Sequence, residues 1–91
     1  MSAIRRIRKA IREGRYDFTD HAKEEAEADR LRLRDVIAIL LSGKIDTTDE
    51  DDQRGTRYVV RGKLADTAVD VVCRFDSDGR LLIVITVYVV D

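Results

Sequence analysis

Residues 80–90 constrain the fold more than any other segment, because almost every position between them is apolar. Neighbouring side chains of an extended chain point to opposite sides of a sheet. A strand here carries aliphatic residues on both faces, with Leu81, Ile83, Ile85, Val87 and Val89 on one and Leu82, Val84 and Val90 on the other. Such a strand usually lies inside a sheet rather than at its edge. We therefore predict that Arg80–Val90 is a central strand.

β-Branched residues dominate the chain from Lys44 onwards, which is typical of strands. Four strands are predicted: Lys44–Thr48, Arg57–Gly62, Ala68–Phe75 and Arg80–Val90. The turn-forming residues Asp76–Gly79 join the last two strands, and Gly62–Thr67 leaves room for a looser hairpin before them. The last three strands are therefore expected to form an antiparallel meander.

This meander leaves the final strand at one end, and a long hydrophobic edge is a template for unwanted pairing. We expect the short segment Lys44–Thr48 to return beside the final strand, which gives the order second, third, fourth, first. If that segment pairs elsewhere, the final strand is expected to recruit a second copy of the chain or a partner's strand. A monomer and a homodimer through the sheet edge both stay open.

The first half of the chain follows the 3.6-residue period of helices. Helices are predicted over Ser2–Glu13, about Asp20–Asp29 and Arg34–Ser42. Ser2 and Thr19 are suitable N-caps, and Gly14 and Gly43 are suited to end the first and third helices. Helices that precede strands indicate an α+β fold, with two or three N-terminal helices packed on a four-stranded, mainly antiparallel sheet.

The length of 91 residues predicts a single domain, 1–91, and the composition excludes several classes of protein. With one cysteine and one histidine, the chain has no disulfide framework and no multi-histidine metal motif. No phosphate-binding glycine-rich loop is present either, so we expect no metal and no cofactor. No apolar run reaches the ~20 residues that span a bilayer. A cytoplasmic protein that does not enter the membrane is expected.

Charged side chains are distributed unevenly along the chain. The formal net charge of −1 argues against binding nucleic acid through bulk charge. Residues 5–15, however, hold six basic groups against the single acidic Glu13. This segment is either a solvated helix face or a local basic patch. Five carboxylates within residues 46–52 are expected to form an exposed, extended acidic loop.

His21 and Tyr88 are the candidates for acid–base chemistry. His21 stands near the start of the second predicted helix, where the helix dipole favours the neutral imidazole that a general base needs. The alternative for His21 is a structural hydrogen-bonding role. Tyr88 lies on the final strand, where a tyrosine among apolar neighbours more often packs on the sheet than takes part in chemistry.

Arg57, Arg61 and Arg74 are the candidates for binding phosphate, because guanidinium groups stabilise an anionic transition state. Cross-strand ion pairs on a solvated face are the alternative. Asp70 interrupts an apolar run and needs a partner, for which we expect Arg74, on the same face of the same strand. Cys73 alternates with apolar residues of the third strand, so we expect it to be buried and unreactive.

Several motifs follow one another along the chain. They are T-D-H-A at 19–22, G-K-I at 43–45, D-Q-R-G at 52–55, Y-V-V-R-G at 58–62 and T-V-Y at 86–88. In this order the motifs resemble the bacterial and archaeal proteins grouped as domain of unknown function 4258 (DUF4258), over nearly the whole chain. The resemblance implies helices followed by an antiparallel sheet. It also implies a distant similarity to RelE-type toxins, which cleave messenger RNA without a metal and are inhibited by antitoxins.

The resemblance marks His21 and Tyr88 as the residues that line any site. Many members have arginine where this chain has Glu25 or Asp29, and histidine where it has Asp70. Two functions therefore stay open. One is a RelE-like endoribonuclease toxin, with RNA or an antitoxin-like protein as partner, in which His21 or Tyr88 moves a proton and an arginine neutralises the phosphate. The other is a noncatalytic protein-interaction module that kept the fold.

Overall fold

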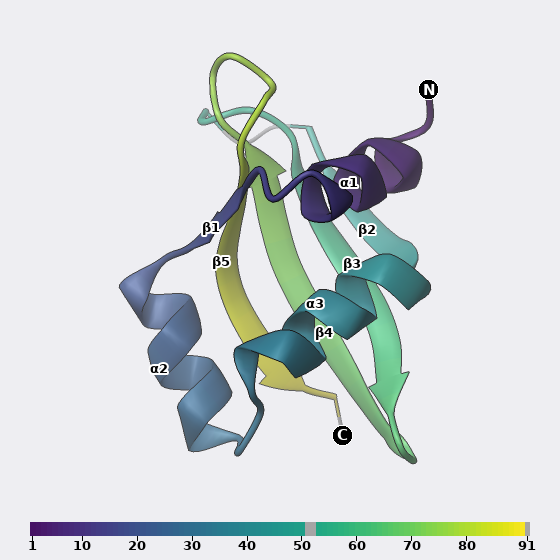
Figure 1. Cartoon of the computed structure of the whole chain (residues 1–91), viewed down its shortest axis with the longest axis vertical. Coiled ribbons are helices and arrows are strands. Elements are labelled where there is room, and N and C mark those ends of the chain that lie inside the picture. The colour runs from purple at the N-terminus through teal and green to yellow at the C-terminus, as the bar shows by residue number, and fades with distance from the viewer. Residues whose placement is uncertain (51–52, 91) are drawn as a thin grey trace.

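The computed structural model describes residues 1–50 and 53–90 (Figure 1). Its helices are α1 (Ala3–Arg12), α2 (Asp20–Ala28) and α3 (Leu33–Ser42). Its strands are β1 (Tyr16–Phe18), β2 (Lys44–Asp49), β3 (Arg57–Leu64), β4 (Thr67–Phe75) and β5 (Leu82–Val89). The α+β class is confirmed for this part of the chain, but the sheet has five strands instead of four, and one of its four pairings, between β1 and β5, is parallel.

The strands follow the order β1-β5-β4-β3-β2 across the sheet. The meander of β3, β4 and β5 is antiparallel as predicted, and β2 extends it antiparallel to β3. β1 adds a parallel strand on the other side of β5, with Phe18 opposite Val84. The final strand is therefore flanked on both sides, which confirms its central position.

The segment that covers the edge of β5 is not the one that the sequence predicted. Lys44–Thr48 belongs to β2 at the opposite edge of the sheet, whereas Tyr16–Phe18 lies beside β5. The reason is the end of α3: Gly43 lies so close to β3 that a Cβ on it would stand 2.6 Å from the carbonyl oxygen of Arg61. A chain leaving α3 there enters the sheet next to β3. β1 and Thr19 together cover the first half of this edge of β5, from Leu82 to Ile85.

The helices lie against one face of the sheet (Figure 1), and a single apolar core joins the two layers. Its fully buried residues include Ile7, Val36 and Leu40 from the helices and Val60, Val71, Leu82, Val84 and Val87 from the strands. Gly62 of β3 lets α3 pack closely, because a Cβ there would stand 3.0 Å from Cγ2 of Ile39. In the described part of the chain, the opposite face of the sheet carries no helix.

Two connections differ from the sequence prediction. The β3–β4 hairpin is tight rather than loose: Leu64 pairs with Thr67, and Ala65 takes a left-handed φ of 54° between them. The predicted acidic loop is shorter, because Asp46 and Asp49 belong to β2 and pair with arginines of β3. Residues 51 and 52 of that loop lie outside the described residues.

Thr19 connects α2 to the sheet with a single hydroxyl. Its Oγ1 accepts a hydrogen bond from the backbone N–H of Ala22 at 3.0 Å, which caps α2 as predicted. The same hydroxyl donates to the carbonyl oxygen of Ile85 on β5 at 2.9 Å. Thr19 therefore fixes the start of α2 and the position of β1 beside β5.

Replacing Thr19 by valine is expected to lower the free energy of unfolding by about 1–2 kcal/mol, because the cap and the bond to β5 are lost together while the shape is kept. Urea unfolding followed by circular dichroism measures the change. Ser2→Ala is the matched control, since its cap is exposed and its bond to the N–H of Arg5 is 3.4 Å long. Equal losses in the two variants contradict the double role of Thr19.

Cys73 is fully buried in β4, as predicted, and burial raises the pKa of its thiol to about 12. At pH 8 only about one thiol in ten thousand is then ionised in the folded protein. We therefore expect no reaction with a disulfide reagent in native buffer and one equivalent of reaction after unfolding in urea. Stoichiometric labelling within minutes in native buffer would show that this face of β4 is open to solvent.

Candidate functional site

Four of the five predicted site residues lie on the uncovered face of the sheet. Arg57 of β3 stands opposite Arg74 of β4. Further along the strands, Asp70 of β4 lies between Arg61 of β3 and Tyr88 of β5. Residues directly opposite one another share a face of the sheet. The structure therefore gathers these side chains into two groups, one around Asp70 and one around Arg74.

Asp70 is the buried centre of the first group, with 2% of its surface exposed. Arg61 binds it with both arms: Nε lies 2.7 Å from Oδ1, and Nη2 lies 3.0 Å from Oδ2. The prediction that Arg74 is the partner of Asp70 was wrong, because Arg61 holds this position. Residues directly opposite on neighbouring strands stand ~5 Å apart, whereas Asp70 and Arg74, at i and i+4 along one strand, are ~13 Å apart. The cross-strand arginine is therefore the one that reaches Asp70.

Arg61 also contacts a second carboxylate. A register shift between Ile45 and Thr47 interrupts the pairing of β2 at Asp46, whose Oδ1 lies 3.4 Å from Nη1 of Arg61. The hydrogen bond to Asp70, and then the charges of Asp70 and Asp46, raise the pKa of Arg61 above its usual value. Arg61 is thus a permanent cation whose charge is already balanced inside the protein.

Tyr88 is 42% exposed at the side of this cluster. Partial desolvation, followed by the negative charge of Asp70, raises the pKa of its phenol. The phenol therefore keeps its proton at neutral pH, which suits a donor and not a base. In the second group, Nη2 of Arg57 pairs with Oδ2 of Asp49 at 3.1 Å, and Nη1 of Arg74 lies 3.5 Å from the carbonyl oxygen of Phe75.

His21 is not part of this face. It lies exposed on the first turn of α2, in the helix layer. Among residues 1–50 and 53–90, no hydrogen bond or ion pair joins the side chain of His21 to Tyr88 or to the three arginines. Contacts within the described chain therefore do not bring His21 together with the other four predicted site residues.

A second charged surface lies on α1, which has five basic residues and no acidic one. A groove of 410 Å³ runs along this helix and is lined by Met1, Arg5, Arg8, Lys9 and Arg12. We call these five residues the α1 groove. None of them was among the predicted site residues. The sequence did indicate this surface through the excess of basic residues over 5–15. From the sequence alone, that segment was either a solvated helix face or a local basic patch.

The cations of the α1 groove are paired differently from those of the sheet. Arg8 donates from Nη2 to the carbonyl oxygen of Gly43 at 3.0 Å, which ties α1 to the end of α3. Within the described residues, the side chains of Arg5, Lys9 and Arg12 have no hydrogen bond or ion pair. These three positions are spaced i, i+4, i+7 and therefore lie on one face of the helix.

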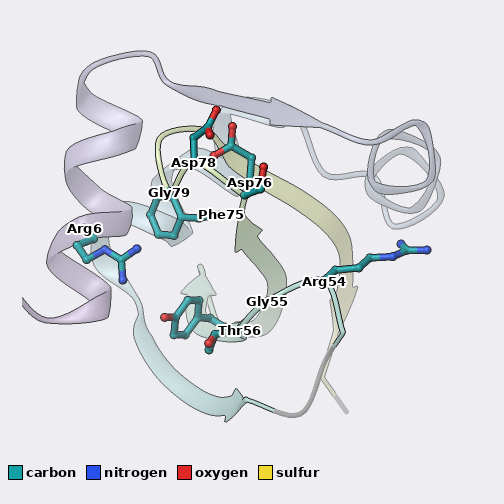
Figure 2. A pocket seen from close by; sticks show the side chains of 10 residues that line it. Arg6, Arg54, Gly55, Thr56, Phe75, Asp76, Asp78 and Gly79 are labelled. Atoms are coloured by element: carbon teal, nitrogen blue, oxygen red, sulfur yellow. The ribbon is translucent and has the colours of Figure 1, made fainter.

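A third feature is a pocket of 340 Å³ at the end of the sheet, shown in Figure 2. It lies between α1, the residues before β3 and the β4–β5 turn. Its lining consists of Arg6, Arg54, Gly55, Thr56, Tyr58, Phe75, Asp76, Ser77, Asp78 and Gly79. The guanidinium carbon of Arg6 stands 4.6 Å from the centre of the Phe75 ring, a cation–π contact.

The described residues offer neither a metal cluster nor a membrane helix. No three His, Cys, Asp or Glu side chains in this part of the chain gather closely enough to hold a metal ion. None of its helices combines the length and the apolar character needed to cross a bilayer.

Comparison with known proteins gives one match. The model of the family described as domain of unknown function (DUF4258) matches residues 18–89. The chain belongs to the DUF4258 family. No curated protein and no solved structure matches it. The matched range begins at Phe18, the last residue of β1, and covers α2, α3 and the strands β2 to β5. α1 and its groove precede this range.

Asp70→Asn is expected to lower the free energy of unfolding by about 1.5–3 kcal/mol, because a buried, charged hydrogen-bond partner of Arg61 is lost. Asp46→Asn, which removes the exposed carboxylate from the same arginine, is expected to cost less than about 1 kcal/mol. Chemical unfolding of both variants beside the unmodified protein measures the difference. If the two substitutions cost the same, Asp70 is not the anchor of this face.

Proposed function

We propose that this DUF4258 domain is a noncatalytic module that binds RNA through the α1 groove. The observation that carries the proposal is the contrast between two sets of cations. On the sheet, Arg61 lies between two carboxylates and Arg57 pairs with a third. On α1, Arg5, Lys9 and Arg12 share one face without an anionic partner in the described chain. Cations of the second kind are available for the phosphates of a nucleic acid.

The near-neutral net charge is compatible with this function because the charges are separated in space. α2 carries the acidic residues Asp20, Glu24, Glu25 and Glu27 against the single basic Lys23. RNA is repelled from this helix and attracted to α1. A domain with such an uneven charge distribution approaches a polyanion in one orientation.

The contacts favour binding over RelE-like cleavage. Cleavage without a metal needs a proton acceptor, a proton donor and a cation around one phosphate. Here Tyr88 has a raised pKa and is protonated, which leaves His21 as the remaining candidate base. His21 lies on α2, and no contact in the described chain joins it to the cations of the sheet. The other function left open by the sequence is a noncatalytic protein-interaction module. Such a module would use the cations Arg5, Lys9 and Arg12 only if its protein partner were acidic.

The test is a triple substitution, Arg5→Gln, Lys9→Gln and Arg12→Gln, with binding of single-stranded RNA measured by fluorescence anisotropy between 50 and 200 mM salt. For single strands, the slope of log K against log salt changes by ~0.7 for each phosphate contact. We therefore expect the triple variant to flatten the slope by about 2 and to weaken binding on the order of 100-fold at 100 mM salt. Glutamine is a good helix former, so α1 is expected to stay folded.

The matched control replaces Lys23, Arg30 and Arg34 by glutamine, which removes the same charge from exposed positions outside the α1 groove. Its slope is expected to equal that of the unmodified protein. Equal losses in both triple variants indicate binding by overall charge, and absence of RNA binding at low salt rejects the proposal. RNA cleavage by the unmodified protein that His21→Ala or Tyr88→Phe abolishes would instead establish the ribonuclease.

A further inference from the structure

The pocket at the end of the sheet has a wall of aromatic and cationic groups. Arg6 reaches from α1 toward Phe75, the last residue of β4, as Figure 2 shows. The Arg6 side chain has no hydrogen bond or ion pair in the described chain, so its N–H groups are available to a ligand. Tyr58, which is 8% exposed, forms part of the floor.

Two glycines leave open space in the lining of the pocket. Gly55 and Gly79 both take positive φ angles, 108° and 70°, and line the pocket. A Cβ placed on either glycine would meet no atom within 4 Å. The pocket thus combines two aromatic rings and a guanidinium plane with two glycines and with the polar side chains of the β4–β5 turn. Its 340 Å³ falls within the range of about 300–1,000 Å³ that is usual for small-molecule sites.

We infer that this pocket receives one unpaired base of the RNA bound by the α1 groove, an inference that rests on the proposed function. Single-stranded RNA is recognised by stacking splayed bases on aromatic rings and on arginine planes. Arg6 lies on α1 about 60° around the helix from Lys9 and about 100° from Arg5. One strand therefore places phosphates along the groove and turns a neighbouring base towards Phe75.

The pocket has no excess of positive charge with which to bind a phosphate, because its lining holds two arginines, Arg6 and Arg54, and two aspartates. Asp76 and Asp78 stand at its edge in Figure 2. The backbone N–H groups of Arg80 and Leu81 donate to Oδ1 of Asp76 at 2.9 and 3.1 Å, and these bonds lower the pKa of Asp76. An ionised carboxylate repels a phosphate but not a neutral base. The phosphates are accordingly left to the α1 groove, where no acidic side chain lies.

The experiment compares a ten-nucleotide adenosine RNA with an abasic ribose-phosphate strand of equal length. Stacking on an aromatic side chain changes affinity by roughly 5- to 150-fold per base. We expect the unmodified protein to bind the RNA at least about fivefold more tightly than the abasic strand. Phe75→Leu is expected to bring this ratio close to one while leaving the salt dependence unchanged.

Two further variants keep the test decisive. Phe18→Leu changes the other phenylalanine of the chain, which lies on β1 away from the pocket, and is expected to preserve the ratio. Arg6→Leu leaves Phe75 in place and is expected to lower the ratio even if Phe75→Leu fails to fold. Equal binding of both strands by the unmodified protein, or a ratio that survives both pocket variants, overturns the base pocket and leaves the proposed function standing. Absence of binding to either strand refutes the proposed function itself.

Discussion

β5 is an apolar strand that needs a neighbouring strand on each side, and the rest of the fold follows from this requirement. Its residues Leu82, Val84 and Val87 are fully buried against the helices. A strand of this kind left at an edge invites association with other chains. β1 covers the first part of that edge, beside Leu82–Val84, and Thr19 joins the end of β1 to both α2 and β5. The first helix–strand connection therefore protects the strand that comes last in the sequence.

The same topology separates two kinds of positive charge. Arginines on β3 face the uncovered side of the sheet, where β2 and β4 bring carboxylates directly beside them. These arginines stabilise the pairing of the strands. Their positive charge is balanced by the neighbouring carboxylates, so their attraction for an anionic ligand is weak. α1 itself contains no acidic residue. Among the described residues, Arg8 binds the end of α3 and Arg6 contacts the ring of Phe75, whereas Arg5, Lys9 and Arg12 have no hydrogen bond or ion pair. Arg57 and Arg61 of the sheet are thus paired with carboxylates, whereas these three cations of α1 have no anionic partner among the described residues.

The family match and the proposed binding surface cover different parts of the chain. Residues 18–89 belong to the DUF4258 match, whereas the α1 groove and Arg6 precede it. The pocket joins the two parts, because Arg6 comes from α1 while Phe75 and the β4–β5 turn come from the matched domain. Binding through this pocket therefore depends on how α1 is placed on the family fold, for which the bond from Arg8 to Gly43 provides one fixed point.

Local patterns in the sequence determined the helices, their caps at Ser2 and Thr19, the antiparallel meander and the burial of Cys73. Each depends on a period or a cap that spans only a few neighbouring residues. The partner of Asp70, the position of β2 and the role of Tyr16–Phe18 depended on tertiary structure. A three-residue strand is too short to show an alternating pattern, and an ion pair across strands depends on register, which no single segment specifies. The sequence likewise contained the six basic groups of residues 5–15, but only the fold decided which cations have carboxylate partners, because pairing requires two distant segments to meet.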